Sequence, residues 1–575
     1  MDTEKRIEKM KRPLSVMAAS GAGDAADPVD YGSLFEINPD FLKPEFIEQV
    51  RATLAGTTTD SKPFPHISLE NFLTNSRALD CLRDELERAR WTTKATDLYS
   101  MKRTTELINF DATVFPGLKE FRRFLTTKGR EFMMKLTGVE LNERVDVAGS
   151  CYEECDVLLP HDDRMEERKF AFILYLTPEW QEDWGGQLVL FNADDKHYPT
   201  DVSKKIVPKW NNFLFFDINH ETGHTSWHCV EEVVAPGKKR LSLNGWFHIN
   251  DIGNSRALPP EPELDKITPS LNIDYEDVRA WINPIYIASS EQKAIKKLFA
   301  SKSELALCNF LTAEKYAEAL KELKSAEYIS TGPPNIRFVE RLDESKLPQK
   351  SAIRDLLNLM RSEAMTLLIT QWTGLHLFDL KLVQKFDSEP PEKKQKTEGE
   401  KKEVKIISFI NKMTQGCYSL CDDQMAADAL NNGFCFDLLL FFMDNSEWNK
   451  DAGGYLSYIA ANDPNEILRV DPVSNGAAFV FREPEVLNFT KYLNSKSGKN
   501  SYYILNCSYY SNSSGDSETE SSDENDDEYD DDSENYGTEP RTDESENDEY
   551  FNNKDSDVDQ AGKADNADLP DEAKQ

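Results

Sequence analysis

The stretch HDDRMEERKFAFILYLTPEWQEDWGGQL (residues 161–188) contains the patterns that decide the fold. Its centre, AFILYL (171–176), is a short apolar run that predicts a buried strand. Two later runs predict a second buried strand, FLFF (213–216), and a half-buried strand with alternating polarity, LSLNGWFHI (241–249). Turn clusters such as GG, PKWNN and PGKK separate these runs. Short strands between turns favour an antiparallel β-core with helices packed outside it, which is an α+β fold.

The same motifs occur twice along the chain. Three motifs of the first half recur in the second half in the same order, at offsets of 266, 268 and 264 residues. Three collinear matches at a nearly constant offset predict two copies of one fold. The motif pairs are CYEECD from Cys151 and CYSLCD from Cys417, WQEDWGGQL from Trp180 and WNKDAGGYL from Trp448, and PKWNNFLFF from Pro208 and PVSNGAAFV from Pro472.

Composition divides the chain into five segments. A polar arm and an acidic tail, both expected to be disordered, flank two folded domains that a Pro-rich linker separates. The second domain begins with the helical patterns SEQKAIKKLFA and AEKYAEALKELKSA and contains a charged insertion without core-forming residues. The predicted boundaries are 1–30 for the arm, 31–255 for the first domain, 256–285 for the linker, 286–510 for the second domain with its insertion at 388–405, and 511–575 for the tail.

The negative charge is concentrated in the tail. Of the formal net charge of −36, residues 511–575 contribute −21, from 25 Asp/Glu against 4 Lys/Arg, and the other 510 residues carry about −15. A folded part that is not basic disfavours a substrate held through nucleic-acid phosphates, so nucleic acid is not expected to be required. The tail could bind basic partners or simply keep the protein soluble.

Several features indicate an intracellular protein. Nine scattered cysteines are typical of reduced thiols in the cytosol or nucleus. No apolar run approaches the roughly 18–20 residues that cross a membrane, and the charged N-terminus lacks the apolar centre of a secretory signal. Lys393, Lys394 and Lys396 could serve as a nuclear-import signal, although a solvated charged loop explains them equally well. We expect the protein in the nucleus and the cytoplasm, without membrane contact.

The histidines distinguish the two copies. All eight except His376 precede the linker, and the second copy has CDDQM where the first has HDDRM. On an extended strand, the spacing of His161 and Asp163 would place both side chains on one face. His228, from a distant strand, would complete two imidazoles and one carboxylate. Such a set occupies one face of an octahedral Fe(II) and leaves three positions for substrate, oxygen and water.

Arg240 begins the alternating strand RLSLNGWFH, twelve residues after His228. Ser242 lies two positions on and should share its face. A fixed guanidinium binds a carboxylate in bidentate fashion, which is what a dicarboxylate cosubstrate needs at its far end. Trp246 and Phe247 on the same strand could wall the cosubstrate pocket or belong to the core.

A second metal pattern overlaps the first. His220, Glu221 and His224 match the H-E-x-x-H pattern of zinc peptidases, with His228 as a possible third ligand. That pattern requires a helix, whereas this segment closely follows a strand and contains Gly and Thr, which are poor helix formers. We therefore prefer iron and retain a zinc metallopeptidase as an alternative.

Taken together, these residues resemble the intracellular prolyl-3-hydroxylases that modify a small-subunit ribosomal protein near the decoding centre. The resemblance covers roughly residues 35–510 and rests on HDD, AFILYL, W-x-x-x-x-G-G, FLFF, the distal His and RLSLNGWFH. It implies two tandem double-stranded β-helix (jelly-roll) domains with flanking helices, the second without a metal site. It also implies Fe(II), 2-oxoglutarate and O2 as cofactors, with ascorbate in support. Carried over by motif, His161, Asp163 and His228 would bind the iron, and Arg240, Tyr175 and Tyr152 would bind 2-oxoglutarate. Ser242, on the same strand face as Arg240, is expected to join this cosubstrate site.

The implied reaction is hydroxylation of a prolyl C3, with 2-oxoglutarate converted to succinate and carbon dioxide. The implied partners are a ribosomal protein substrate and, through an influence on translation accuracy or termination, termination factors. Two alternatives stay open besides the zinc peptidase. One is another substrate for the same cofactors, and the other is a non-enzymatic two-domain scaffold in translation complexes.

Overall fold

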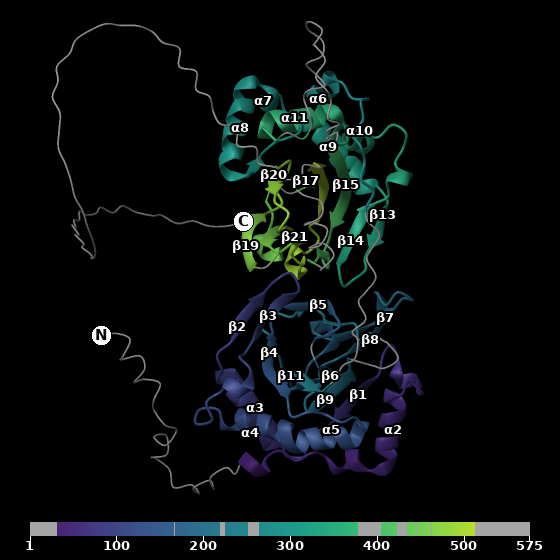
Figure 1. The fold of residues 1–575 in the computed structure, drawn as a ribbon, viewed down its shortest axis with the longest axis vertical. Helices are drawn as coiled ribbons and strands as arrows, with labels where there is room; N and C mark the ends of the chain where they lie inside the picture. Colours follow the sequence, from purple (N-terminus) through teal and green to yellow (C-terminus); the bar gives the residue numbers. More distant parts are fainter. Residues whose placement is uncertain are drawn as a thin grey trace, which may run out of the picture. The chain divides into compact units, whose positions relative to one another are not determined.

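The computed structural model describes residues 31–165, 167–218, 225–250, 264–375, 377, 404–421, 434–444, 447–461 and 463–511 (Figure 1). All of these residues belong to one compact unit. The predicted arm and almost all of the predicted insertion and tail lie outside the described residues. The predicted insertion ends too late, because Val404 and Lys405 begin a strand. Among the described residues, no helix combines the length and the apolar character needed to span a membrane.

The first domain is built on one antiparallel sheet of 11 described strands, in the order β1-β9-β6-β11-β4-β3-β5-β10-β7-β8, with β2 paired to β3. One end of β3 pairs with β4 and the other with β5, so the sheet curls into two layers at β3. The strands are β1 His66–Glu70, β2 Thr92–Ala95, β3 Tyr99–Arg103, β4 Val145–Tyr152, β5 Val157–His161, β6 Arg168–Tyr175, β7 Leu188–Ala193, β8 Pro199–Ile206, β9 Asn212–Asp217, β10 His228–Val230 and β11 Arg240–His248.

The strands predicted from AFILYL, FLFF and LSLNGWFHI are confirmed as β6, β9 and β11. The prediction that β11 is half-buried is wrong, because eight of its nine residues are buried and only Asn244 is intermediate. One face of β11 packs against the helical layer through Leu241, Leu243 and Phe247. Its polar face is also enclosed, because it points into the space between the two layers of the curled sheet.

Four α-helices cover the outer face of the first sheet, as Figure 1 shows. They are α2 Pro44–Leu54, α3 Ser76–Arg88, α4 Pro116–Phe124 and α5 Arg130–Thr137, and a π-helical turn at Leu125–Gly129 joins the last two. Leu79, Leu82 and Leu86 recur at helical spacing on α3 and are buried in the same core as the β11 residues. The buried Glu85 carboxylate accepts hydrogen bonds from the backbone N–H groups of Gly117 and Leu118, which fixes α4 to α3.

The second domain has its own core, with helices on an eight-stranded sheet in the order β12-β20-β17-β22-β15-β14-β13, to which β16 is added at β14, and a three-stranded sheet β19-β18-β21. Its strands are β12 Glu304–Leu307, β13 Tyr328–Thr331, β14 Arg337–Leu342, β15 Val404–Met413, β16 Tyr418–Ser419, β17 Cys435–Met443, β18 Leu456–Ala460, β19 Asp463–Val470, β20 Ala477–Arg482, β21 Val486–Thr490 and β22 Tyr502–Ser511. Its helices are α6 Tyr275–Trp281, α7 Pro284–Ile287, α8 Ser289–Lys302, α9 Ala313–Ser325, α10 Ala352–Met360 and α11 Glu363–Thr373.

The helices predicted from SEQKAIKKLFA and AEKYAEALKELKSA are confirmed as α8 and α9. The predicted linker 256–285 extends too far. Its described part includes α6, whose Val278 and Trp281 are buried in the second core. The capping residue Asp274 begins α6 by accepting hydrogen bonds from the backbone N–H groups of Glu276 and Asp277.

The repeated motifs occupy matching places in the two sheets. The run β9-β6-β11-β4 corresponds to β20-β17-β22-β15, and β8-β7-β10 corresponds to β19-β18-β21. Trp180 Nε1 donates to the Gly185 carbonyl at 2.8 Å, and Trp448 Nε1 donates to the Gly453 carbonyl at 3.0 Å. The two tryptophan motifs therefore build the same turn.

The proline motifs also share one structure. Asn211 and Asn475 both adopt a left-handed backbone conformation, with φ of 59° and 50°. The side chain of Asn211 bonds both backbone groups of Leu73, and that of Asn475 bonds both backbone groups of Leu311. In each domain this asparagine anchors an earlier segment of the chain to the end of a central strand.

Candidate active site

Two histidines meet between the layers of the first sheet. His161 is the last residue of β5 and His228 the first of β10, and they are direct partners in the antiparallel ladder. Each ring is oriented by a bond from Nδ1 to a backbone carbonyl two residues earlier, Leu159 at 2.8 Å and Ser226 at 2.7 Å. These bonds leave both Nε2 atoms facing the interior, with the ring centroids 4.2 Å apart.

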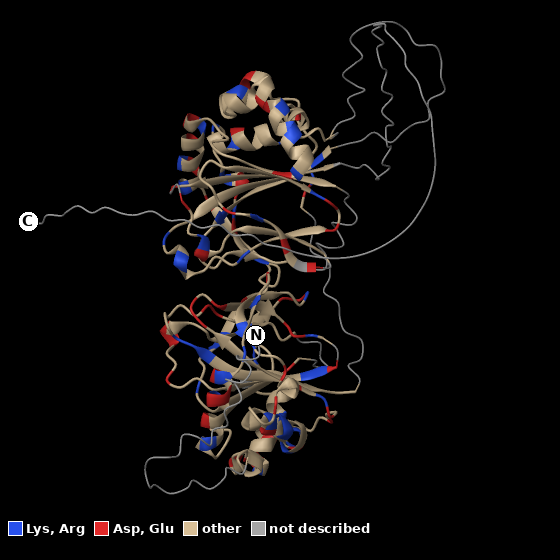
Figure 2. Cartoon of the chain, turned by 90° about the vertical axis from the view of Figure 1, so that its left-hand side faces the viewer, with Lys and Arg blue, Asp and Glu red and all other residues tan. Residues whose placement is uncertain are grey.

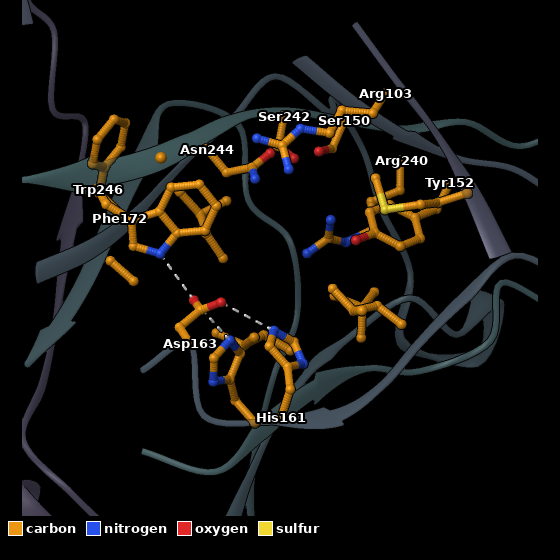
Figure 3. A pocket seen from close by; sticks show the side chains of 18 of the residues that line it. Arg103, Ser150, Tyr152, His161, Asp163, Phe172, Arg240, Ser242, Asn244 and Trp246 are labelled. Carbon is orange, nitrogen blue, oxygen red and sulfur yellow. Dashed lines mark hydrogen bonds and ion pairs between the residues drawn. The ribbon is translucent and has the colours of Figure 1, made fainter. Parts of the chain in front are cut away.

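Asp163 completes this group (Figure 3). Its Oδ1 lies 3.4 Å from His161 Nε2, and its Oδ2 lies 3.5 Å from His228 Nε2. One ligand atom from each of the three residues can be chosen so that all lie within 4.8 Å of one another. It is the only such group of three or more His, Cys, Asp or Glu residues within the described parts of the chain.

The route by which Asp163 reaches this position differs from the prediction. We expected His161 and Asp163 to share one face of an extended strand. Strand β5 instead ends at His161, and Asp163 adopts a left-handed conformation with φ of 60°. This turn in the backbone, rather than strand alternation, brings the carboxylate beside the histidines. A non-glycine residue in this region costs about 1 kcal/mol or more, which the surrounding structure must offset.

The three side chains influence one another's protonation. Burial by itself would raise the pKa of the Asp163 carboxyl, but hydrogen bonds from His161 and His228 outweigh burial and hold this pKa well below its usual value. Burial would lower the pKa of His161, but the Asp163 carboxylate outweighs it and raises this pKa. A buried, ionised carboxylate between two imidazoles is a favourable site for a divalent cation, because the carboxylate and the neutral imidazoles supply ligand atoms.

Trp246 supports the carboxylate from β11. Its indole Nε1 donates to Asp163 Oδ2 at 3.1 Å. The Arg168 guanidinium lies 3.7 Å from the centroid of the indole ring, and the Arg103 guanidinium 5.6 Å from it. The sequence predicted Trp246 to be a pocket wall or a core residue and did not indicate this contact. Its even spacing from Arg240 along β11 was the available signal, because it puts both on the inner face.

A cavity of about 60 Å³ extends from the triad toward Arg240 and is drawn in Figure 3. Inner-face residues of two paired strands line this cavity, namely Ser150 and Tyr152 of β4 and Ser242 and Asn244 of β11. Sequence reasoning identified Tyr152, Arg240 and Ser242 but missed Ser150 and Asn244, which β4–β11 pairing brings to the same space. Small polar side chains at these positions leave room for a ligand.

Arg240 is enclosed but incompletely bonded. It is 1% exposed, and its Nε donates to the Gly186 carbonyl at 2.7 Å. Its guanidinium carbon lies 5.0 Å from the ring centroid of Tyr152 and 5.1 Å from that of Tyr175. Among the described residues, neither Arg240 Nη2 nor the Tyr175 hydroxyl has a hydrogen-bond partner. Two buried donors without an acceptor fit a carboxylate group, because a buried donor left unpaired costs about 1–3 kcal/mol.

A larger groove of about 700 Å³ adjoins the triad and opens to solvent. Its lining includes His161, Asp163 and Trp246 from the first domain. Tyr455, Ser457, Ile459, Phe489 and Lys491 from the second domain line the same groove. The zinc-peptidase alternative is not tested by this geometry, because His220, Glu221 and His224 lie outside the described residues.

Comparisons with known proteins agree with this site. Residues 147–248 match the 2OG-Fe(II) oxygenase superfamily, and residues 273–518 match the oxoglutarate and iron-dependent oxygenase degradation C-terminal family. The chain is 34% identical over 447 residues to the prolyl 3-hydroxylase OGFOD1 of Xenopus laevis, covering 76% of this chain and 84% of that protein. It is 32% identical over 492 residues to the prolyl 3-hydroxylase OGFOD1 of Mus musculus, covering 76% of this chain and 86% of that protein.

The solved structures that match include a Pseudomonas putida prolyl-4-hydroxylase, with 20% identity, a TM-score of 0.28, and coverage of 35% of this chain and all of that one. The matches to the Xenopus and mouse proteins cover most of each relative and most of this chain. The cofactors of the matched superfamily are Fe(II), 2-oxoglutarate and O2, and the His-Asp-His group suits them. The chain therefore belongs to the prolyl 3-hydroxylase family of Fe(II)- and 2-oxoglutarate-dependent oxygenases.

Proposed function

We propose that this protein hydroxylates C3 of a prolyl residue in a small-subunit ribosomal protein and thereby influences translation accuracy or termination. His161, Asp163 and His228 hold Fe(II) in this proposal, and Arg240 and Tyr175 hold the distal carboxylate of 2-oxoglutarate. The observation that carries the assignment is the pair of unpartnered buried donors, Arg240 Nη2 and the Tyr175 hydroxyl, in the same interior as the triad.

The chain's own residues supply binding, orientation and a water-poor interior. Bound Fe(II), with 2-oxoglutarate and O2, supplies the oxidising chemistry that converts a C–H bond to C–OH. Burial raises the pKa of the Tyr175 hydroxyl, which keeps it protonated and able to donate to a carboxylate. Burial of Tyr152 has the same effect on its pKa. Ser150 and Ser242, which are paired across β4 and β11, add hydroxyl groups at the Arg240 end of the cavity.

The open groove supports a polypeptide substrate. It places aromatic and polar side chains of both domains beside the triad, including Trp246, Tyr455 and Phe489. An extended chain passing along the groove could present one prolyl ring to the iron while its flanking residues contact either domain. In Figure 2, acidic and basic residues are interspersed over the folded part of the molecule, which favours a polypeptide over a substrate held mainly through phosphates.

The second domain is, in this proposal, a copy of the oxygenase fold that has lost its metal site. The offset of 268 residues between the tryptophan motifs aligns Leu190 with Tyr458. Because Leu190 pairs with His228 and Tyr458 pairs with Asn488, strand register places Asn488 at the position of His228. Register also places Asp437 at the position of Ala171, which lines the cavity of the first domain. Asp437 is buried there in an ion pair with Arg482 at 3.1 Å, so side chains occupy the space that a cofactor would need.

The scaffold alternative would be favoured if the cellular role survived loss of the triad. We infer further that the protein occurs in both nucleus and cytoplasm, which the lysines at 393, 394 and 396 support by composition alone. Microscopy of the tagged chain with Lys393, Lys394 and Lys396 replaced by Ala tests this placement. Nuclear signal that is unchanged by the replacement would contradict the inferred role of these lysines.

The function is tested by incubating the purified chain with Fe(II), 2-oxoglutarate, ascorbate as a supporting reductant, and either isolated small ribosomal subunits or their prolyl-containing peptides. We expect succinate in proportion to a peptide product heavier by one oxygen atom, with hydroxylation at C3 on amino-acid analysis. Asp163→Ala provides the matched inactive variant. Absence of oxygenated product from both subunits and peptides, with succinate at the level of this variant, would overturn the proposal.

A further inference from the structure

Glu232 joins the two domains at a point close to the active site. It lies four residues after His228, is buried, and directs its carboxylate to the second domain. Its Oε1 accepts from the Ser495 backbone N–H at 2.7 Å, and its Oε2 accepts from the Tyr492 hydroxyl at 3.3 Å and the Gln415 amide at 3.5 Å. A carboxylate with three donors from the opposite domain is a specific connection rather than a packing contact.

The backbone of Glu232 continues this connection into the cosubstrate end of the cavity. Its carbonyl accepts from the Gly186 N–H at 3.2 Å. The Gly186 carbonyl in turn accepts from Arg240 Nε at 2.7 Å. Glu232 and Gly186 therefore link the donors of the second domain to the buried guanidinium, through one hydrogen bond between Glu232 and Gly186 and one between Gly186 and Arg240.

The Gly-Gly turn fits this arrangement closely. Gly185 and Gly186 both have positive φ, of 74° and 71°. A Cβ at Gly185 would lie 1.9 Å from the Glu232 carbonyl oxygen, so only glycine permits this approach. At Gly186 a Cβ would lie 3.1 Å from Cδ of Arg240. The turn is thus held between Glu232 and Arg240, and displacement of one would be transmitted to the other.

The second domain repeats the turn but without the arginine. A Cβ at Gly453 would lie 2.2 Å from the Tyr492 carbonyl oxygen. In the first domain, a Cβ at Gly185 would lie similarly close to the Glu232 carbonyl oxygen, at 1.9 Å. Tyr492 and Glu232 are thus counterparts that hydrogen-bond to each other across the domain contact. The Gly454 carbonyl accepts from the Tyr502 hydroxyl, in place of a guanidinium.

We propose that the second domain positions the cosubstrate arginine through Glu232 and Gly186, so that affinity for 2-oxoglutarate depends on the domain contact. Glu232 is a positioning residue, since it acts through Arg240 and does not line the cavity. The proposal rests on the proposed function only in taking Arg240 as the 2-oxoglutarate anchor. It predicts that loosening Glu232 weakens cosubstrate binding more than turnover, because a mobile Gly186 carbonyl no longer fixes the guanidinium.

The test compares Glu232→Ala, Glu232→Gln, Tyr492→Phe and Ser495→Ala in the full chain. We measure KM for 2-oxoglutarate, kcat, KM for the peptide and Tm. Glu232→Ala should raise KM for 2-oxoglutarate about five- to tenfold, equivalent to losing the net contribution of one ordinary hydrogen bond, with kcat within about twofold. Tyr492→Phe should give a smaller rise, and Glu232→Gln should largely restore the wild-type value because its amide oxygen still accepts from Ser495 N–H.

Ser495→Ala is the matched control, because it removes only the hydroxyl and keeps the backbone N–H that donates to Glu232. It should leave KM for 2-oxoglutarate unchanged. Should Glu232→Ala and Tyr492→Phe lower kcat and Tm without changing KM for 2-oxoglutarate, the connection would be merely structural and the inference overturned. Arg240→Ala separates the two proposals. If this variant binds 2-oxoglutarate as the wild type does, Arg240 is not the anchor that the proposed function assigns. If Arg240→Ala loses 2-oxoglutarate binding but the Glu232 variants keep it, the connection alone fails.

Discussion

Tyr502 occupies in the second sheet the register position that Arg240 occupies in the first. Leu243 of β11 pairs with Leu174, and Leu505 of β22 pairs with Leu440. Arg240 lies three positions before Leu243, and Tyr502 lies three positions before Leu505, so the two residues correspond. Each donates to the carbonyl of the second glycine in its Gly-Gly turn. In both domains a side-chain donor at this position bonds the Gly-Gly turn, and we propose that the guanidinium of Arg240 also binds a carboxylate.

Replacing Arg240 with lysine tests that distinction. Lysine keeps the positive charge but replaces the planar fork with a single nitrogen. It therefore cannot bond both the Gly186 carbonyl and a carboxylate as the guanidinium does. We expect KM for 2-oxoglutarate to rise about 30- to 100-fold, from loss of about 2–3 kcal/mol of charged hydrogen bonding. Isothermal titration with 2-oxoglutarate in the presence of Mn²⁺ measures the affinity without turnover. An Arg240→Lys variant with wild-type affinity would remove Arg240 from the cosubstrate site.

The Trp246 indole is expected to affect metal binding. Trp246→Phe keeps an aromatic ring for Arg168 but removes the N–H that bonds Asp163. If Asp163 binds the metal as proposed, loss of this hydrogen bond should weaken metal affinity or activity about 10- to 100-fold. The apparent KM for Fe(II) measures the effect. Trp91→Phe is the control, because its indole bonds only the Leu86 carbonyl, and an equal change in both variants would contradict the specific role of Trp246.

Asp156 should make the stability of the folded chain depend on pH. Burial raises the pKa of this carboxyl to about 6 in the folded chain, against an ordinary value of 3.8. Between about pH 4 and 6 the unfolded chain loses this proton while the folded chain keeps it, so the residue makes the fold less stable as pH rises. Asp156→Asn should therefore have a higher Tm than wild type at pH 7.5 and an equal Tm at pH 4. A Tm difference that is the same at both values would argue against this assignment.

The two anchoring asparagines should contribute similarly to their domains. Asn211→Ala and Asn475→Ala each remove two hydrogen bonds and place alanine at positive φ. We expect each to lower the free energy of unfolding by about 2–4 kcal/mol. Chemical denaturation with a domain-specific probe measures the two effects. If one substitution were neutral and the other severe, the shared motif would not be serving the same structural purpose in both domains.

Much of this arrangement could be predicted from the sequence because it depends on local pattern or repetition. The strands β6, β9 and β11 follow from apolar runs, and the collinear motifs predicted two related domains. The left-handed turn at Asp163 could not be predicted, because its spacing from His161 is equally compatible with an extended strand. The Trp246–Asp163 and Glu232–Tyr492 contacts join residues 83 and 260 positions apart. Spacing along β11 indicates which face Trp246 lies on, but no pattern in a single sequence indicates which distant residue either side chain contacts.

We propose that His161, Asp163 and His228 hold the iron. The most direct measurement is the Fe(II)-dependent visible absorption of the anaerobic chain with 2-oxoglutarate, compared between wild type, His228→Ala and the control His197→Asn. His197 has positive φ, which asparagine tolerates, and its side chain lies outside the triad. We predict that wild type and His197→Asn show the absorption and bind one iron per chain, whereas His228→Ala shows neither. Retention of stoichiometric iron and full absorption by His228→Ala would contradict the assignment of the site.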